Sequence, residues 1–186
     1  MKKSKVMLFG AMALTAGLAL AACGTSQSSN ADKTYSYIFV NNPDTLDYIT
    51  STRDSTSSIT TNLIDGLLEN DQYGNLIPSM AESWTVSKDG LTYTYKIRQG
   101  AKWYTSEGEE YADVTAHDFV TGLKYAADKK AENLYLVQDS IKGLADYVEG
   151  KSSDFGTVGV KAVDDYTLQY TLNQPRSEER RVGKEC

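Results

Sequence analysis

The sequence has 186 residues, of which 40% are hydrophobic and 24% are charged, and its formal net charge at pH 7 is −6. This length allows one domain or one and a half. The acidic balance argues against nucleic-acid binding and against electrostatic adhesion to anionic lipid.

The first 33 residues predict an export signal followed by a tether. Three lysines precede an apolar run over residues 6–20, which is shorter than the ~20 residues of a membrane-spanning helix. The Leu-Ala-Ala-Cys that ends at Cys23 resembles a bacterial lipobox, which implies that the Cys23 thiol is acylated. We therefore predict a lipoprotein signal peptide at 1–22 and a flexible linker at 23–33. An ordinary signal peptide with an incidental cysteine is the alternative.

The last 11 residues, 176–186, differ abruptly in composition from the rest. They look like the in-frame translation of a DNA-sequencing adapter, so we expect an assembly artefact there and a gene that continues past Pro175. A genuine basic tail is the alternative. Without both terminal segments the chain keeps 12 basic and 22 acidic residues, a net charge of −10. Its exported domain then has no disulfide and depends on its core for stability.

Residues 34–75 predict a strand, a helix and a turn. Residues 34–40 form the strand, and Asn41-Asn42-Pro43-Asp44 ends it with turn chemistry. Residues 51–61 are rich in Ser and Thr, which suit a helix start better than a helix interior. A helix ending near Glu69 is predicted from apolar residues at helical spacing, namely Ile59, Leu63, Ile64, Leu67 and Leu68. A plain turn is predicted over 70–75, because the Asp-x-Asp-x-Asp-Gly spacing of a calcium loop is absent.

The segment 78–103 predicts a β-hairpin and a further short strand at 102–104. Its second strand alternates polar residues with Leu91, Tyr93, Tyr95 and Ile97, which is typical of a half-buried strand. Asp-Gly at 89–90 precedes it, and glycine adopts the positive φ that a hairpin turn requires.

Residues 106–175 predict an acidic loop, two helices and two strands. The loop at 106–113 predicts a solvated surface in preference to a metal site. Thr115 and Asp118 have the spacing of a capping box and open the first helix. The second helix, 141–148, ends before Gly150. Strands are expected over 158–163 and 166–172, with a turn at 164–165.

No catalytic, metal or cofactor site is predicted, and we expect no enzymatic activity. The chain has neither a Gly-rich phosphate loop nor a Gly-x-Ser-x-Gly elbow. The single histidine, His117, falls at the first turn of a helix and is expected at the surface. The 13 tyrosines suit ligands that carry both apolar and polar atoms, although Tyr93 and Tyr95 are expected to pack the sheet.

Six segments together resemble a known family. They are Asp-Thr-Leu-Asp at 44–47, Asn-Leu-Ile-Asp-Gly-Leu-Leu at 62–68, Pro-Ser-Met-Ala-Glu-Ser-Trp at 78–84, the run from 87 to 98, Gly-Ala-Lys-Trp at 100–103 and Thr-Ala-His-Asp-Phe-Val at 115–120. In this order they resemble the extracellular solute-binding proteins of family 5, the dipeptide/oligopeptide type. Within that family the sequence is most similar to the Gram-positive oligopeptide-binding lipoproteins of the Ami/Ali kind.

The resemblance implies a mixed α/β (α+β) fold that forms the N-terminal part of a class II periplasmic-binding-protein-like, two-lobed structure. Residues 34–72 would begin lobe I. Residues 73–175 would form an accessory domain of that lobe, built on the hairpin. The second lobe would lie beyond Pro175.

The resemblance also implies a function, namely capture of oligopeptides for an ABC importer at the extracellular face of the membrane. The partners would be the peptide, the permease and ATPase subunits, and the membrane through the Cys23 lipid. The positions expected to face the ligand are Asn41, Asn42, Pro43, Asp44 and Tyr135. Two alternatives stay open: the first four residues form only a turn, and Tyr135 is a core aromatic. The functional alternatives are a peptide-sensing or adhesion lipoprotein, and a clamshell for nickel or haem.

Overall fold

The computed structural model describes residue 38 and residues 41–175. The chain divides into two units, Met1–Ile38 and Phe39–Cys186, and the description that follows is of the second. The predicted signal peptide, Cys23, the linker, most of the 34–40 strand and the 176–186 tail lie outside the described residues. No helix among the described residues is long and apolar enough to cross a membrane.

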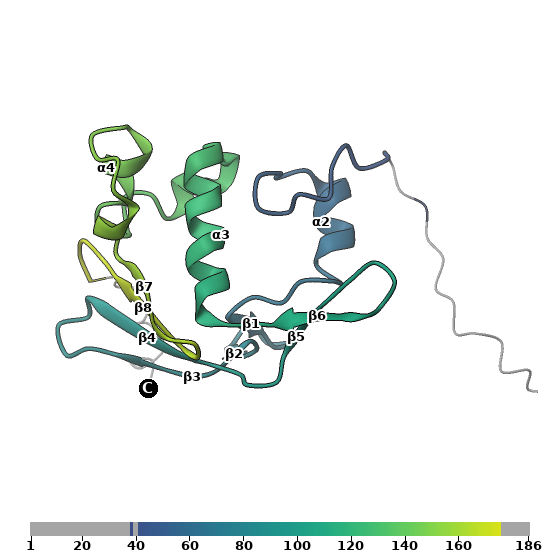
Figure 1. Cartoon of the computed structure of the whole chain (residues 1–186), viewed down its shortest axis with the longest axis horizontal. Helices are drawn as coiled ribbons and strands as arrows, with labels where there is room; N and C mark the ends of the chain where they lie inside the picture. Colours follow the sequence, from purple (N-terminus) through teal and green to yellow (C-terminus); the bar gives the residue numbers. More distant parts are fainter. Residues whose placement is uncertain (1–37, 39–40, 176–186) are drawn as a thin grey trace, which may run out of the picture. The chain divides into compact units, whose positions relative to one another are not determined.

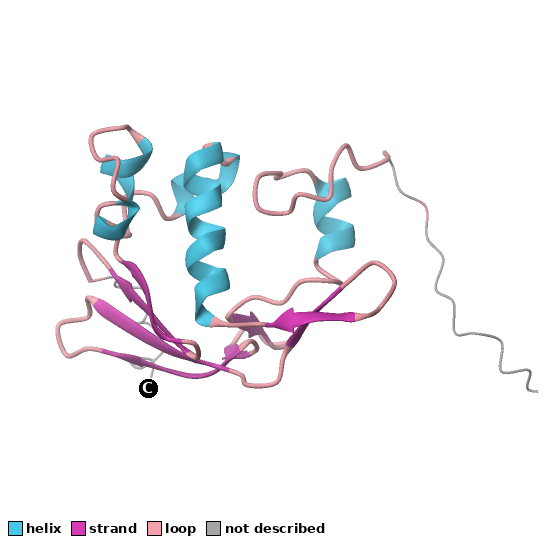
Figure 2. Cartoon of the chain, in the orientation of Figure 1, coloured by secondary structure: helices cyan, strands magenta, loops and turns pink. Residues whose placement is uncertain are grey.

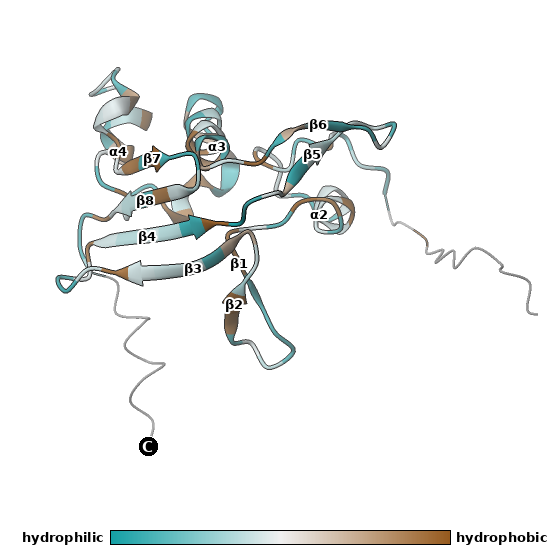
Figure 3. Cartoon of the chain, turned by 60° about the horizontal axis from the view of Figure 1, so that its bottom comes forward, coloured by the Kyte–Doolittle hydropathy of each residue, from teal (hydrophilic) through white to brown (hydrophobic). Residues whose placement is uncertain are grey.

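A four-stranded antiparallel sheet organises this unit. Its strands are β3 (Ala81–Val86), β4 (Thr92–Ile97), β7 (Val160–Asp164) and β8 (Thr167–Thr171). They lie in the order β3-β4-β8-β7, which Figure 3 shows most directly. The predicted hairpin is confirmed as β3 and β4, and Gly90 in its turn has φ of 72°. The predicted C-terminal strand pair is confirmed as β7 and β8.

The two faces of the sheet differ in polarity. One face carries Ile97, Val160 and Leu168, which belong to the buried core and are at most 7% exposed. On the other face Lys96 Nζ donates to Thr167 Oγ1 at 2.7 Å, and Gln169 Nε2 donates to Thr94 Oγ1 at 3.3 Å. The alternation of apolar and polar side chains therefore determines which face receives the helices.

The strand tyrosines pack the sheet, as predicted. Tyr93 is 7% exposed, and Tyr95 meets Tyr170 edge to face with ring centroids 6.1 Å apart. Burial of the hydroxyl, and to a lesser degree the nearby Tyr95, raise the pKa of Tyr170 to about 12. These rings contribute to the core of the domain.

Helix α3 (Ala116–Lys129) lies against β7 and β8, on the apolar face of the sheet (Figures 1 and 2). The predicted capping box is confirmed: Asp118 Oδ2 accepts a 2.7 Å hydrogen bond from the Thr115 backbone N–H. The buried Ala126 and Ala127 allow close packing near the end of the helix. Lys130 ends the helix in the left-handed conformation, with φ of 51°.

Three short helices follow α3. They are the 3-10 helix η1 (Glu132–Leu136), α4 (Leu144–Val148) and the 3-10 helix η2 (Phe155–Thr157). The predicted second helix is thus confirmed as α4, but it begins at Leu144 rather than at 141. The earlier residue, Ile141, instead forms an antiparallel bridge to Leu172 at the end of the sheet.

The prediction of a helix that ends near Glu69 is wrong. Helix α2 (Asp54–Thr60) forms earlier, in the Ser/Thr-rich stretch, and residues 68–70 form strand β1 (Leu68–Asn70) paired with β2 (Leu76–Pro78). In and just after α2, side chains bond back onto the backbone: the hydroxyls of Ser58, Thr60 and Thr61 each donate to the carbonyl four residues earlier, at 2.7 to 3.1 Å. The predicted turn over 70–75 is confirmed as the β1–β2 connection.

The second half of the segment predicted as an acidic loop forms a strand. Strand β6 (Glu110–Asp113) pairs with β5 (Lys102–Tyr104), with a register shift between Trp103 and Tyr104. Lys102 Nζ lies 2.6 Å from Asp113 Oδ1 across this pair. All four residues of β6 are exposed, so the prediction of a solvated surface is confirmed.

Candidate ligand-binding site

Residues 41–53, which lead into α2, form a closed loop, here called the 41–53 loop. Asp44 Oδ2 and Arg53 Nε form an ion pair at 3.0 Å near its two ends. The Asp47 carboxylate holds the middle, because its Oδ1 accepts from the backbone N–H groups of Ile49 at 3.2 Å and Thr50 at 3.3 Å. Hydrogen bonds, the strongest from Thr50 and a weaker one from Tyr125, lower the pKa of Asp47. The loop therefore has a defined conformation of its own.

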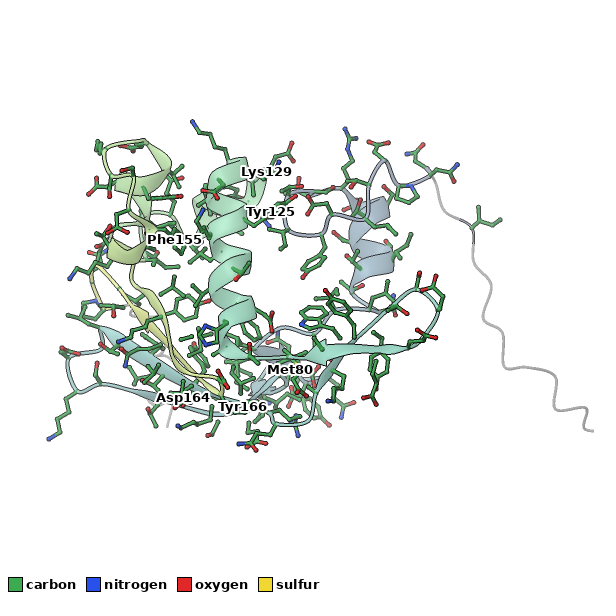
Figure 4. The ribbon with its side chains drawn as sticks, in the orientation of Figure 1. Met80, Tyr125, Lys129, Phe155, Asp164 and Tyr166 are labelled. Atoms are coloured by element: carbon green, nitrogen blue, oxygen red, sulfur yellow. The ribbon has the colours of Figure 1, made fainter. Side chains whose placement is uncertain are left out.

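Three elements anchor the 41–53 loop. The buried Thr56 of α2 donates from Oγ1 to the Thr45 carbonyl at 2.8 Å. Tyr125 of α3 donates from its hydroxyl to Asp47 Oδ2 at 2.9 Å, and Thr52 Oγ1 donates to Glu132 Oε2 of η1 at 2.6 Å. The partners in the last two bonds are 78 and 80 residues apart in sequence. Figure 4 labels Tyr125 near the C-terminal end of α3, beside the loop.

The structure places the predicted ligand-facing residues at the surface. Asn41, Asn42 and Asp44 are exposed and Pro43 is half-buried. Tyr135, in η1, is 73% exposed. The alternative in which Tyr135 is a core aromatic is therefore wrong.

The two predicted elements are linked by hydrogen bonds. Glu132, three residues before Tyr135, accepts the hydroxyl of Thr52. Thr52 precedes Arg53, whose guanidinium pairs with Asp44. The loop, η1 and the end of α3 thus form one assembly that is joined by side-chain hydrogen bonds.

Sequence reasoning missed the residues that build this assembly. Asp47 was part of a recognised motif but had no assigned role, and Tyr125, Thr52 and Glu132 had none. No local spacing rule connects positions about 80 residues apart, so the sequence carries no signal for these pairs.

The chemical groups of this surface suit recognition of a mixed polar and apolar ligand. Asn41 and Asn42 carry amides that both donate and accept hydrogen bonds, and Tyr135 offers a ring with a polar tip. Among the described residues, no three His, Cys, Asp or Glu side chains are grouped as a metal site would require. His117 is a surface residue, as predicted: its side chain is 63% exposed and its Nε2 lies 3.4 Å from Asp165 Oδ1.

The structure is similar to solved structures of OppA proteins. Listeria monocytogenes OppA bound to peptide matches with a TM-score of 0.63 and 33% identity, over 74% of this chain and 26% of that one. The Haemophilus influenzae OppA complex with RPPGFSPFR matches with a TM-score of 0.61 and 31% identity, over 73% of this chain and 26% of that one. The expected fold, a mixed α/β part of a two-lobed binding protein, is confirmed.

The class of protein is therefore a bacterial solute-binding protein. The family model described as "Bacterial extracellular solute-binding proteins, family 5 Middle" matches residues 75–182, and the chain belongs to this family. Oligopeptide-binding protein SarA of Streptococcus gordonii is 64% identical over 184 residues, which covers 95% of this chain and 28% of SarA. Oligopeptide-binding protein AmiA of Streptococcus pneumoniae is 63% identical, over 94% of this chain and 27% of AmiA. The chain spans just over a quarter of the length of these relatives.

Proposed function

We propose that this chain is part of an oligopeptide-binding protein that delivers peptides to an ABC importer. The observation that carries the proposal is its 64% identity, over 95% of its length, to an oligopeptide-binding protein. The exposed amides and aromatic ring of the described surface agree with that ligand class. We infer from the same relatives a binding role with no catalytic step.

In this proposal Asn41, Asn42, Pro43, Asp44 and Tyr135 line one wall of the peptide site. Backbone hydrogen bonds hold an extended peptide whatever its sequence, and exposed pockets accept its side chains. Closure of a second lobe over the peptide then signals occupancy to the permease and ATPase subunits.

We further propose that the protein is anchored at the extracellular face of the membrane through a lipid on Cys23. Palmitate labelling of cells that express the protein tests the anchor. Wild type is expected to incorporate label and to sediment with membranes, whereas Cys23→Ser is expected to do neither. Equal labelling of the two forms contradicts the anchor and leaves peptide binding untouched.

Isothermal titration calorimetry on the full-length protein tests peptide binding. A mixed library of short peptides is applied first, and peptides retained after washing are identified by mass spectrometry and titrated individually. We expect retained peptides with micromolar or tighter affinity, while the 186-residue chain alone binds weakly or not at all. Retention of nickel or haem in place of any peptide would refute the peptide proposal.

A second candidate function is peptide sensing, and one comparison favours it. The structure titled "Structure and mode of peptide binding of pheromone receptor PrgZ" matches with a TM-score of 0.60 and 31% identity, over 69% of this chain. Gene deletion separates the two roles. Loss of growth on peptides as the amino-acid source indicates import, whereas changed gene expression or adhesion with unchanged peptide uptake indicates sensing.

A further inference from the structure

The two hydrogen bonds from the 41–53 loop to α3 and η1 come from side chains that are exposed. Tyr125 is 38% exposed, and both the Tyr125–Asp47 and the Thr52–Glu132 bonds lie at the surface. Surface bonds of this kind contribute little to global stability, because water replaces them readily when the protein unfolds. Their main physical effect is to restrict where the loop lies relative to α3 and η1.

The Asp47 carboxylate couples the inside of the loop to the helix. Its Oδ1 closes the local turn through two backbone N–H groups, and its Oδ2 receives the Tyr125 hydroxyl. A second point of attachment, Thr52 to Glu132, fixes the other end of the loop. Together with the Thr56–Thr45 bond from α2, these two points of attachment restrict the position of the loop relative to α3 and η1.

We propose that Tyr125 and the Thr52–Glu132 pair are positioning residues for peptide recognition. They hold Asn41–Asp44 at a fixed position relative to Tyr135, so that the peptide meets a wall that is already formed. This inference rests on the proposed peptide-binding function. None of these three residues touches the peptide; each acts through the loop.

The expected energetic effect is on affinity. A loop that is ordered before binding adds no ordering cost to the binding step, whereas a released loop must be ordered at the moment of binding. Ordering the backbone of a single residue costs about 1–2 kcal/mol, which corresponds to roughly fivefold to thirtyfold in the dissociation constant.

The test compares four single variants of the full-length protein, with peptides retained from a mixed library as the probe. Tyr125→Phe and Thr52→Val each remove one hydroxyl of the attachment. Thr52→Ser keeps that hydroxyl and is the rescue control. Tyr104→Phe removes a hydroxyl from β5, which is part of neither the 41–53 loop nor α3 nor η1. We expect about fivefold weaker binding for the first two variants and wild-type binding for both controls.

Thermal unfolding of the same four variants separates positioning from a general loss of structure. Unfolding midpoints within about 2 °C of wild type, together with weakened binding, support the inference. Wild-type affinity in Tyr125→Phe and Thr52→Val overturns it, and so does weakened binding that Thr52→Ser does not restore. If wild type itself retains no peptide, the proposed function fails, and that outcome is distinct from unchanged affinity in the variants.

Discussion

Replacement of Gly159 by alanine is expected to destabilise the sheet strongly. Gly159 lies just before β7 and faces the end of β8 so closely that an added Cβ would sit 2.3 Å from the Thr171 carbonyl oxygen and 3.0 Å from Lys142 Cβ. Hydrogen bonds hold the backbone in place at this position. Gly159 donates to the Lys142 carbonyl at 2.7 Å, Thr171 donates to the Gly159 carbonyl at 2.7 Å, and Lys142 donates to the Thr171 carbonyl at 3.0 Å.

The size of the effect follows from this geometry. Moving the Thr171 carbonyl to an ordinary contact distance requires a shift of about 1 Å, and overpacking of this kind costs about 1–3 kcal/mol. The same shift weakens the Lys142–Thr171 hydrogen bond, which adds about 1 kcal/mol. We therefore expect the free energy of unfolding to fall by about 3 kcal/mol.

Urea unfolding, followed by tryptophan fluorescence, measures this change, because Trp84 lies on β3 of the same sheet and Trp103 lies on β5. Gly122→Ala is the matched control, because its new Cβ meets only Ile49 Cδ1 at 3.8 Å and lies inside α3. Alanine is the better helix former by about 1 kcal/mol, so this control is expected to stabilise the protein. A Gly159→Ala protein within about 0.5 kcal/mol of wild type would refute the close-approach reasoning.

Three further predictions concern single side chains. Asp118→Ala removes the capping box of α3 and is expected to cost about 1 kcal/mol in urea unfolding, whereas Asp118→Glu keeps most of it. Thr56→Val deprives the Thr45 carbonyl of its 2.8 Å bond from a buried hydroxyl, for a loss of about 1–3 kcal/mol, while Thr56→Ser stays near wild type. Tyr170, with its pKa raised from 10.0 to about 12, stabilises the fold below pH 10.0, and this stability is lost as pH rises through about 12. The loss is at most ~2.7 kcal/mol and is absent in Tyr170→Phe, which alkaline unfolding of both proteins checks.

The elements that sequence predicted well are those with a strong local signal. The β3–β4 hairpin combines period-two alternation with Asp89-Gly90, and α3 begins with a complete capping box at Thr115 and Asp118. In each case the residues that determine the structure lie within a few positions of one another. Local physics and tertiary packing then agree, so the prediction holds.

The elements that sequence predicted wrongly depend on partners that are distant in the sequence. Leu67 and Leu68 fit helical spacing, but their backbone is used by the sheet: Leu68 pairs with Pro78, and the Leu67 carbonyl accepts from the Ala81 N–H at 2.9 Å. Short apolar runs fit strand and helix equally well, and distant partners decide between them. In the same way Glu110 and Asp113 predicted a loop by their charge, and pairing with β5 made them a strand.

The candidate site also combines features that the sequence predicts with features that it does not. That Asn41, Asn42 and Asp44 are exposed and lie outside any helix or strand could be predicted from Asn-Pro chemistry, and the structure agrees. That Tyr135 is exposed, and that η1 is bonded to the 41–53 loop, depends on a contact between Thr52 and Glu132 that no local pattern encodes.

Sheet stability and loop position depend on different contacts, so they can be changed separately. The side-chain hydrogen bonds that anchor the 41–53 loop reach α2, α3 and η1, whereas the close approach at Gly159 involves only Lys142 and Thr171. Sites without shared partners change free energies nearly additively. Below the urea transition, Gly159→Ala should therefore bind peptide like wild type in spite of its lower stability. Tyr125→Phe should show the reverse, with normal stability and weaker binding. If both changes instead lower the peptide affinity in proportion to the loss of stability, the order of the loop follows global folding. The loop then has no independent role in recognition.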